Sequence, residues 1–195
     1  MPVLVKQTFP EVIETQRLVL RCYQGEDAFG ILELVQQNRA RRVQEFAQRA
    51  SLVTLDEARL LVSEKREHWS VGKAFCYGIW LKHANEQIGQ IQVKNVAWEI
   101  PSAELGYFIS TSSQRQGYAS ESIRGILKLA FQDSRFQRIF VRVLSSNRGS
   151  FSTAKRLGFL EEGFHRKAFR CGLGELHDVH YLALTSDDYR RQCAQ

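Results

Sequence analysis

Long apolar runs and prolines are both scarce in this sequence of 195 residues, which contains three prolines. The apolar stretch 31–35 is interrupted by Glu33 and falls far short of the roughly 20 residues that a membrane-spanning helix needs. At the N-terminus, only Val3–Val5 precede Lys6, which is too short for the apolar region of a secretory signal. We therefore expect no membrane-spanning segment and a cytoplasmic location.

The sequence also has few cysteines and no close pair of them. Its four cysteines are scattered, and none forms a C-x-x-C motif. A chain of this length can be stable without covalent cross-links, so the thiols are expected to be free. Because no linker-like stretch divides the chain, a single domain is predicted over residues 15–195, after an N-terminal extension of residues 1–14.

Acidic residues are fewer than basic ones. Lys and Arg number 27 against 21 for Asp and Glu, which gives a formal net charge of +6. This excess favours an anionic partner, such as nucleic acid, the ribosome, an acidic protein or a phosphorylated cofactor. The sign of the charge does not choose among them.

The hydrophobic pattern predicts strands and helices in the order β, α, α, β, β, β, α, β, α, β, β. Residues 17–22 alternate as a strand does, and apolar residues recur at helical spacing after Asp27. Thr54 and Glu57 form a capping-box signature before a second helix that extends to about Trp69. The later elements are strands at 74–81, 87–97, 103–110, 138–144, 159–167 and 176–184, helices from Gly117 and at 149–157, and a last turn capped by Ser186.

The heptad Gln114–Ser120 lies between a predicted strand and a predicted amphipathic helix. Such a turn exposes unpaired backbone N–H groups, and the helix dipole adds partial positive charge. Gly117 allows close backbone approach, Ala119 keeps the next turn uncluttered, and Arg115 adds charge at the rim. The pattern predicts a diphosphate site, although an ordinary strand-to-helix turn has the same local sequence character.

Gln114, Gly117 and Ala119 match the Q/R-x-x-G-x-G/A acetyl-CoA signature of the GNAT superfamily of N-acetyltransferases. From Thr15 onward, nearly the whole chain resembles the ribosomal-protein N-acetyltransferase branch of that superfamily. Further segments match that branch in the same order: TQRLVLR at 15–21, AELGY at 103–107, N-x-x-S at 147–150 with LGF at 157–159 and EG at 162–163, and D-x-x-Y at 178–181.

The resemblance implies an α/β (α+β) GNAT fold, with a twisted mixed sheet flanked by helices. Its fourth and fifth strands splay to admit the pantetheine arm of acetyl-CoA, which bonds to an open strand edge as in β-augmentation. No metal is expected. The cofactor-binding residues that it implies are the backbone of Tyr107, Phe108 and Ile109 for the arm, the diphosphate loop Gln114, Arg115, Gln116, Gly117, Tyr118, Ala119 and Ser120, and Asn147 for the arm.

Glu104 is the candidate general base, because several members of the superfamily carry a carboxylate on this strand and burial raises proton affinity. A strand carboxylate that binds substrate or pairs with a neighbouring Arg is the alternative.

Ser150 is the candidate that assists the departing thiolate. Many members of the superfamily place a Tyr seven residues after the Asn, but here that position is Ala154. Ser150 is the residue that the ribosomal-protein branch shows three positions after the Asn, and its hydroxyl can donate to the thiolate. In the alternative interpretation, Ser150 only helps to start the helix at 149–157.

Two other patterns are given no role. His177 and His180 stand three apart on a strand-like segment, so their side chains point to opposite faces and do not form a metal site. The basic run of Arg39, Arg41 and Arg42, with Arg49 further on, is interpreted as a solvated face.

The sequence therefore predicts an acetyl-CoA-dependent N-acetyltransferase, a monomer or homodimer, whose acceptor is the N-terminal α-amine of a protein such as a ribosomal protein. Small-molecule amines, including aminoglycosides and polyamines, are open within the same chemistry. Two alternatives of other classes are a nucleic-acid- or ribosome-binding protein and a regulator that binds CoA without catalysis. No recognisable nucleic-acid motif supports the first of these.

Overall fold

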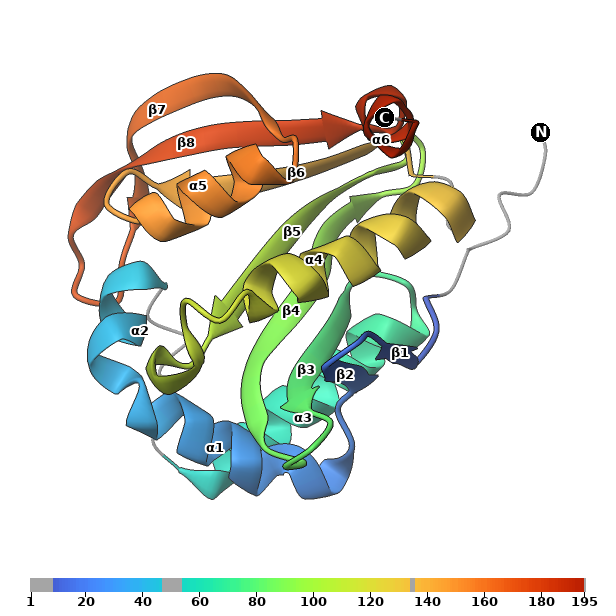
Figure 1. The fold of residues 1–195 in the computed structure, drawn as a ribbon. Coiled ribbons are helices and arrows are strands. Elements are labelled where there is room, and N and C mark those ends of the chain that lie inside the picture. Colours follow the sequence, from blue (N-terminus) through green and yellow to red (C-terminus); the bar gives the residue numbers. More distant parts are fainter. Residues whose placement is uncertain (1–8, 47–53, 134–135, 195) are drawn as a thin grey trace.

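A twisted sheet of eight strands organises the computed structural model, which describes residues 9–46, 54–133 and 136–194 (Figure 1). The spatial order is β1-β2-β3-β4-β5-β6-β8-β7, and the only parallel pair in this part of the chain is β5 with β6. The strands are β1 (Val12–Glu14), β2 (Leu18–Cys22), β3 (Phe75–Leu81), β4 (Gln87–Ala97), β5 (Ser102–Ile109), β6 (Arg138–Leu144), β7 (Leu160–Arg170) and β8 (Leu176–Thr185).

Helices cover both faces of this sheet. In Figure 1, α4 crosses in front of the sheet and α3 lies behind it. The helices are α1 (Ala28–Gln37), α2 (Arg39–Glu45), α3 (Leu55–Ser70), α4 (Tyr118–Lys128), α5 (Arg148–Arg156) and α6 (Ser186–Cys193). The mixed sheet with flanking helices is the architecture that the resemblance implies.

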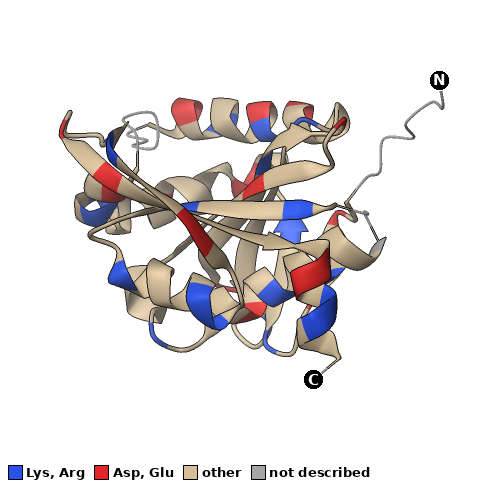
Figure 2. Ribbon diagram, turned by 90° about the horizontal axis from the view of Figure 1, so that it is seen from above, with Lys and Arg blue, Asp and Glu red and all other residues tan. Residues whose placement is uncertain are grey.

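Two hydrophobic clusters hold the layers together. The larger cluster joins α4 to the sheet through residues such as Ile123 and Ile126, which are fully buried. The smaller one joins α1 and α3 to β3 through Ile31, Val62 and Cys76. The outer face of α3 alternates acidic and basic residues (Figure 2), as expected for an amphipathic surface helix.

The predicted start of the second helix is confirmed. Thr54 and Glu57 form the predicted capping box at the start of α3. All four cysteines are free thiols, and burial raises the pKa of Cys22 to about 11. No helix among the described residues has the length and apolar character needed to cross a membrane.

Two elements escaped the sequence prediction. Strand β1 lies within the segment that was assigned to an N-terminal extension, and Ile13 and Phe9 from this segment are buried in the core. Its three residues are too few to show a period. Helix α2 contains only two apolar residues, Ala40 and Val43, so it carries no apolar stripe that periodicity can detect.

The predicted cap at Ser186 is wrong by one residue. Thr185 is the N-cap of α6: its Oγ1 accepts a hydrogen bond from the backbone N–H of Asp188 at 3.2 Å. Ser186 is the first helical residue, and its hydroxyl donates to Oε1 of Gln137 at 2.9 Å. Both residues are common caps, so only the backbone geometry separates them.

Candidate active site

Strands β5 and β6 separate after a short paired stretch. Their parallel pairing covers only Ser102–Glu104 against Arg138–Phe140, and the rest of each strand diverges. The stretch 105–109 of β5 therefore has no pairing with β6, which leaves a strand edge that an extended ligand can occupy. The splay expected of the two central strands is present.

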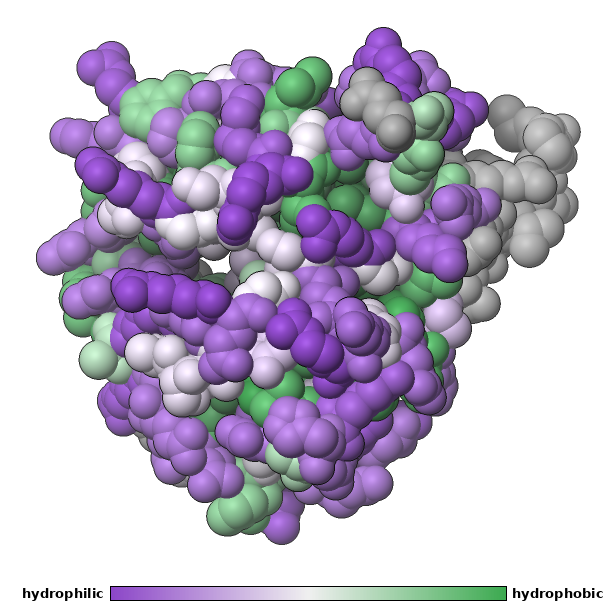
Figure 3. Space-filling view, viewed as in Figure 1, coloured by the Kyte–Doolittle hydropathy of each residue, from purple (hydrophilic) through white to green (hydrophobic). Residues whose placement is uncertain are grey.

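A cavity of about 1410 Å³ fills this wedge. Figure 3 shows a hollow on the left of the molecule, rimmed by hydrophilic residues. The predicted site residues that line the cavity are Glu104, Tyr107, Phe108, Ile109, Gln114, Arg115, Gly117, Tyr118, Ala119, Ser120, Asn147 and Ser150. Gln116 is the one predicted residue that does not line it; its backbone carbonyl accepts a hydrogen bond from Arg17.

The loop before α4 has the geometry of an anion site. Gly117 is the N-cap of α4 in the left-handed conformation, with φ of 83°, and no side chain caps this helix. The first N–H groups of the helix are thus left without a side-chain acceptor, and the helix dipole favours negative charge there. Arg115 also has a positive φ, of 62°, which turns the chain sharply between β5 and α4.

Arg17, which directly precedes β2, contacts this loop and the first turn of α4. Its Nη1 donates to the carbonyl of Gln116 at 3.0 Å, its Nε donates to Glu121 at 2.7 Å, and its guanidinium lies 4.6 Å from the ring centre of Tyr118. Thr15 donates to the same carboxylate at 2.6 Å. We call this set of contacts the Arg17 bridge. It gives the TQR segment at the start of the domain a structural purpose that sequence reasoning missed.

Asn147 and Ser150 lie on the first turn of α5. Asn147 is the N-cap, and its Oδ1 accepts a hydrogen bond from the backbone N–H of Ser150 at 3.0 Å. Its amide NH₂ has no hydrogen-bond partner in the part of the chain that the structure describes, so it can donate to a ligand. The helix start therefore belongs to Asn147, and Ser150 lies beside the Tyr107 phenol.

Tyr107 brings a second hydroxyl to the same place. Its phenol donates to the backbone carbonyl of Ser150 at 3.4 Å, and burial raises the pKa of this phenol. Ala154, one turn further along α5, is only 2% exposed and packs in the core. The sequence analysis gave Tyr107 a role only through its backbone. The absence of a Tyr at position 154 was the sequence feature that could have directed attention to the Tyr107 hydroxyl.

Glu104 is 4% exposed and lies in a cationic setting. Lys94 Nζ is 3.2 Å from Oε1, and Arg142 Nη2 is 3.1 Å from Oε2. The amide of Asn95 donates to Oε2 at 2.7 Å. A carboxylate has about four lone-pair positions, so three donors leave about one for an incoming proton.

Comparisons with known proteins agree with this geometry. The acetyltransferase (GNAT) domain family matches residues 17–160. The chain belongs to the GNAT acetyltransferase family. It is thus an N-acetyltransferase that uses acetyl-CoA, and the fold expected from the resemblance is confirmed.

Individual relatives cover nearly the whole GNAT chain. It is 26% identical over 179 residues to the uncharacterized N-acetyltransferase p20 of Bacillus licheniformis, covering 92% of this chain and 98% of p20. Its fold superimposes on RimL, a ribosomal L7/L12 alpha-N-protein acetyltransferase in complex with coenzyme A, with a TM-score of 0.85. The two are 24% identical, and the match covers 91% of this chain and 99% of RimL. The fold also superimposes on the microcin C7 self-immunity acetyltransferase MccE, in complex with acetyl-CoA and AMP, with a TM-score of 0.82. The two are 21% identical, and the match covers 91% of this chain and 97% of MccE.

Two residues of the basic run on α2, Arg41 and Arg42, line the acetyltransferase cavity, whereas Arg39 is exposed. Arg42 is only 5% exposed, and burial lowers its pKa to about 10. Arg41 lies 4.4 Å from the ring centre of Phe108 and pairs with Glu45 at 3.0 Å. The interpretation as a solvated face is therefore wrong for Arg42, because the short helix turns it inward. Arg49 lies outside the described residues.

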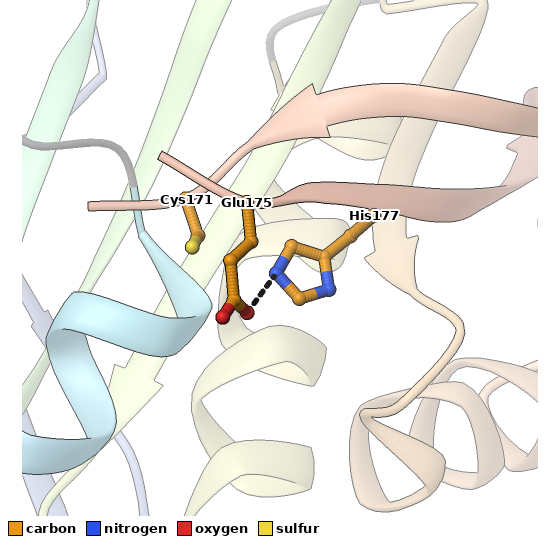
Figure 4. Close-up of side chains that lie close together, drawn as sticks. All are labelled: Cys171, Glu175 and His177. Carbon is orange, nitrogen blue, oxygen red and sulfur yellow. Dashed lines mark ion pairs between the residues drawn. The ribbon is translucent and has the colours of Figure 1, made fainter. Parts of the chain in front are cut away.

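The two histidines of β8 contact different residues and do not meet, as predicted. His180 pairs with Glu161 at 2.6 Å, whereas His177 lies 3.7 Å from Glu175 (Figure 4). Cys171 completes a group whose ligand atoms lie within 4.8 Å of one another. The Glu175 side chain is 65% exposed, and an exposed carboxylate beside a His is an ordinary surface ion pair. We assign no metal to this group.

Proposed function

We propose that this acetyltransferase transfers the acetyl group of acetyl-CoA to the N-terminal α-amine of a protein, such as a ribosomal protein. The observation that carries the donor half is the wedge between β5 and β6, which opens beside the uncapped N-terminus of α4. The acceptor half is supported by the likeness to RimL, whose name gives a ribosomal protein as its substrate.

Within this proposal, the backbone of Tyr107, Phe108 and Ile109 bonds the pantetheine arm. The loop 114–120 holds the diphosphate, and Asn147 donates its free amide NH₂ to the arm. Backbone N–H groups of the open strand stabilise the oxyanion; one such donor is worth roughly 3 to 4 kcal/mol in other enzymes.

Glu104 accepts the proton of the acceptor amine as the new N–C bond forms, using the lone-pair position that its three partners leave. The C–S bond of the thioester breaks, and the electron pair leaves on sulfur. Ser150 donates a hydrogen bond to this thiolate, and the Tyr107 phenol lies close enough to Ser150 to supply a second hydroxyl.

A small-molecule amine is the second candidate acceptor. It is favoured by the likeness to MccE, which was solved with acetyl-CoA and the small molecule AMP. The same donor site serves both candidates, so only the acceptor separates them.

An acceptor screen distinguishes these candidates. Purified protein is first tested for a thermal shift with acetyl-CoA; ligand at about 100 times its Kd adds about 2.7 kcal/mol of stability. It is then incubated with ribosomal-protein peptides, the same peptides with blocked N-termini, aminoglycosides and polyamines, with a thiol reagent to detect released CoA. We expect turnover of the free peptides alone, with the acetyl group located on the N-terminal residue by mass spectrometry. Turnover of only the small amines contradicts the protein acceptor.

A further inference from the structure

A second cavity, of about 640 Å³, lies beside the diphosphate loop along α4. Gly117, Ser120 and Arg156 line both this cavity and the main one, so the two open next to each other. Apart from Gly117 and Ser120, none of the residues that line this second cavity has been given a role in binding or catalysis. We call it the α4 groove.

Positive charge dominates the α4 groove. Four of its lining residues are cations, namely Arg17, Arg124, Lys128 and Arg156, and Glu121 is its only carboxylate. Four positive charges and one negative charge give a local sum of +3. Glu121 is already committed to Thr15 and Arg17 at 2.6 and 2.7 Å.

The cations on α4 form a row that starts at the cofactor loop. Ser120, Arg124 and Lys128 are spaced four residues apart and therefore lie along one helix face. At 1.5 Å per residue, Arg124 lies roughly 6 Å and Lys128 roughly 12 Å along the axis from Ser120.

This row is not explained by internal pairing. Arg124 and Lys128 are exposed, and neither has an ion pair or a hydrogen bond with any side chain among the residues that the structure describes. Like charges four residues apart repel and cost a few tenths of a kcal/mol in an isolated helix. Gly125 lies between them and puts no side chain into the groove. An anion in the groove would relieve the repulsion.

We propose that the α4 groove binds the phosphomonoester on the ribose of coenzyme A, the 3′-phosphate. The inference rests on the proposed use of loop 114–120 for the diphosphate, since the adenosine of CoA extends from that diphosphate. A phosphomonoester carries a charge of about −1.5 to −2 at neutral pH. Arginine side chains match phosphate with paired N–H donors, and Lys128 adds a point charge.

The test compares acetyl-CoA with acetyl-dephospho-CoA, which lacks only this phosphate. Calorimetry gives the Kd of each, and steady-state kinetics give kcat/KM. We expect the wild type to prefer acetyl-CoA by about tenfold or more. In the double variant Arg124→Gln/Lys128→Gln the preference falls to near one, because affinity for acetyl-CoA drops while affinity for the dephospho form stays constant.

Lys155→Gln is the matched control, because Lys155 is an exposed cation on α5 that lines neither cavity. It should keep the wild-type preference. Equal affinity of the wild type for both cofactors, an equal loss of both in the double variant, or a lost preference in Lys155→Gln would each overturn the inference. The failure of the proposed function is distinguishable, since neither cofactor would then bind or be turned over.

Discussion

Arg17 and Glu121, which are 104 residues apart in the chain, form an ion pair of 2.7 Å between Nε and Oε2. Through this pair, the turn before β2 holds the first turn of α4, and Arg17 also bonds the loop carbonyl of Gln116. The loop that we propose to receive the diphosphate is thereby positioned by a residue near the start of the domain. Stability of the Arg17 bridge and cofactor affinity are therefore expected to be coupled.

The Arg17 bridge should make stability depend on pH. Burial raises the pKa of Glu121, but hydrogen bonds from Thr15 and Arg17 outweigh it, and the pKa is lowered overall. Such a carboxylate adds stability above its ordinary pKa of about 4.3, and this contribution is lost as the pH falls through the lowered value. We expect Glu121→Gln to cost about 1 kcal/mol at pH 7, since Arg17 is partly exposed.

Urea unfolding at pH 7 and near pH 3 checks this prediction, because the difference in stability between wild type and variant should shrink as the pH falls. Asp56→Asn removes an exposed ion pair with Arg59 and serves as the control, with an expected change below about 0.5 kcal/mol. A difference for Glu121→Gln that persists unchanged in acid contradicts the ion-pair explanation.

Gly117→Val should abolish the thermal shift that acetyl-CoA produces. Its φ of 83° disfavours any side chain, and a Cβ would meet Arg17 Nη2 at 3.3 Å, so the anion-binding turn must rearrange. We expect cofactor affinity to fall at least about tenfold, or 1.4 kcal/mol. Gly174→Val is the control, since Gly174 has a similar φ of 85° with open space around it. Wild-type affinity in Gly117→Val would remove the main support for the diphosphate site.

Asn147 has two separable tasks, one in the fold and one in binding. Asn147→Ser keeps an oxygen that can cap α5 but is too short to reach the pantetheine arm, so cofactor affinity should fall with little loss of stability. Asn147→Ala should lose affinity and also about 1 kcal/mol of stability, because the cap is lost. A hydrogen bond to the pantetheine arm that is equally strong in the ground and transition states changes mainly the affinity for the cofactor, and not the turnover rate. Calorimetry and thermal unfolding of both variants provide the comparison.

Ser150→Ala should depress turnover at saturating substrates with little change in cofactor affinity, because negative charge on sulfur develops only as the bond breaks. The expected loss is at most about 10²- to 10⁴-fold. Stability should stay within about 0.5 kcal/mol. Ser145→Ala, an exposed serine outside the cavity, is the control.

Tyr107→Phe, alone and combined with Ser150→Ala, shows whether the phenol shares this task. If the hydroxyls substitute for one another, the double variant loses more than the product of the single losses. Wild-type turnover in Ser150→Ala and in the double variant, under conditions where chemistry limits the rate, would mean that the thiolate leaves unassisted.

Glu104→Gln should lower the rate with amine acceptor about 10²-fold or more while leaving acetyl-CoA binding unchanged. The change also weakens the contacts with Lys94 and Arg142, so Lys94→Gln is the control: it removes one ion pair and keeps the carboxylate. If Glu104 accepts the proton, Glu104→Gln removes one limb of the pH profile of kcat/KM, whereas Lys94→Gln retains that limb. Equal losses in both variants would assign Glu104 to the alternative role of an ion-pair partner.

Local sequence determined most of the element order. Strands of five residues or more, and helices with an apolar stripe such as α4, can be predicted from the periodicity of their apolar residues. Capping residues such as Thr54 show where a helix begins. The turn before α4 was also predictable, since a glycine between a strand and a helix is a local feature. These properties depend on residues within about one or two turns of each other.

Tertiary structure alone decided which distant residues share the site. The divergence of β5 from β6, the bridge from Arg17 to Glu121, and the three partners of Glu104 join segments whose pairing leaves no local period. The inward turn of Arg42 was unreadable for the same reason, because a short basic helix looks like a solvated face until its neighbours are known. Sequence pattern reports which face of an element is apolar, whereas side-chain contacts across a cleft depend on how the elements pack.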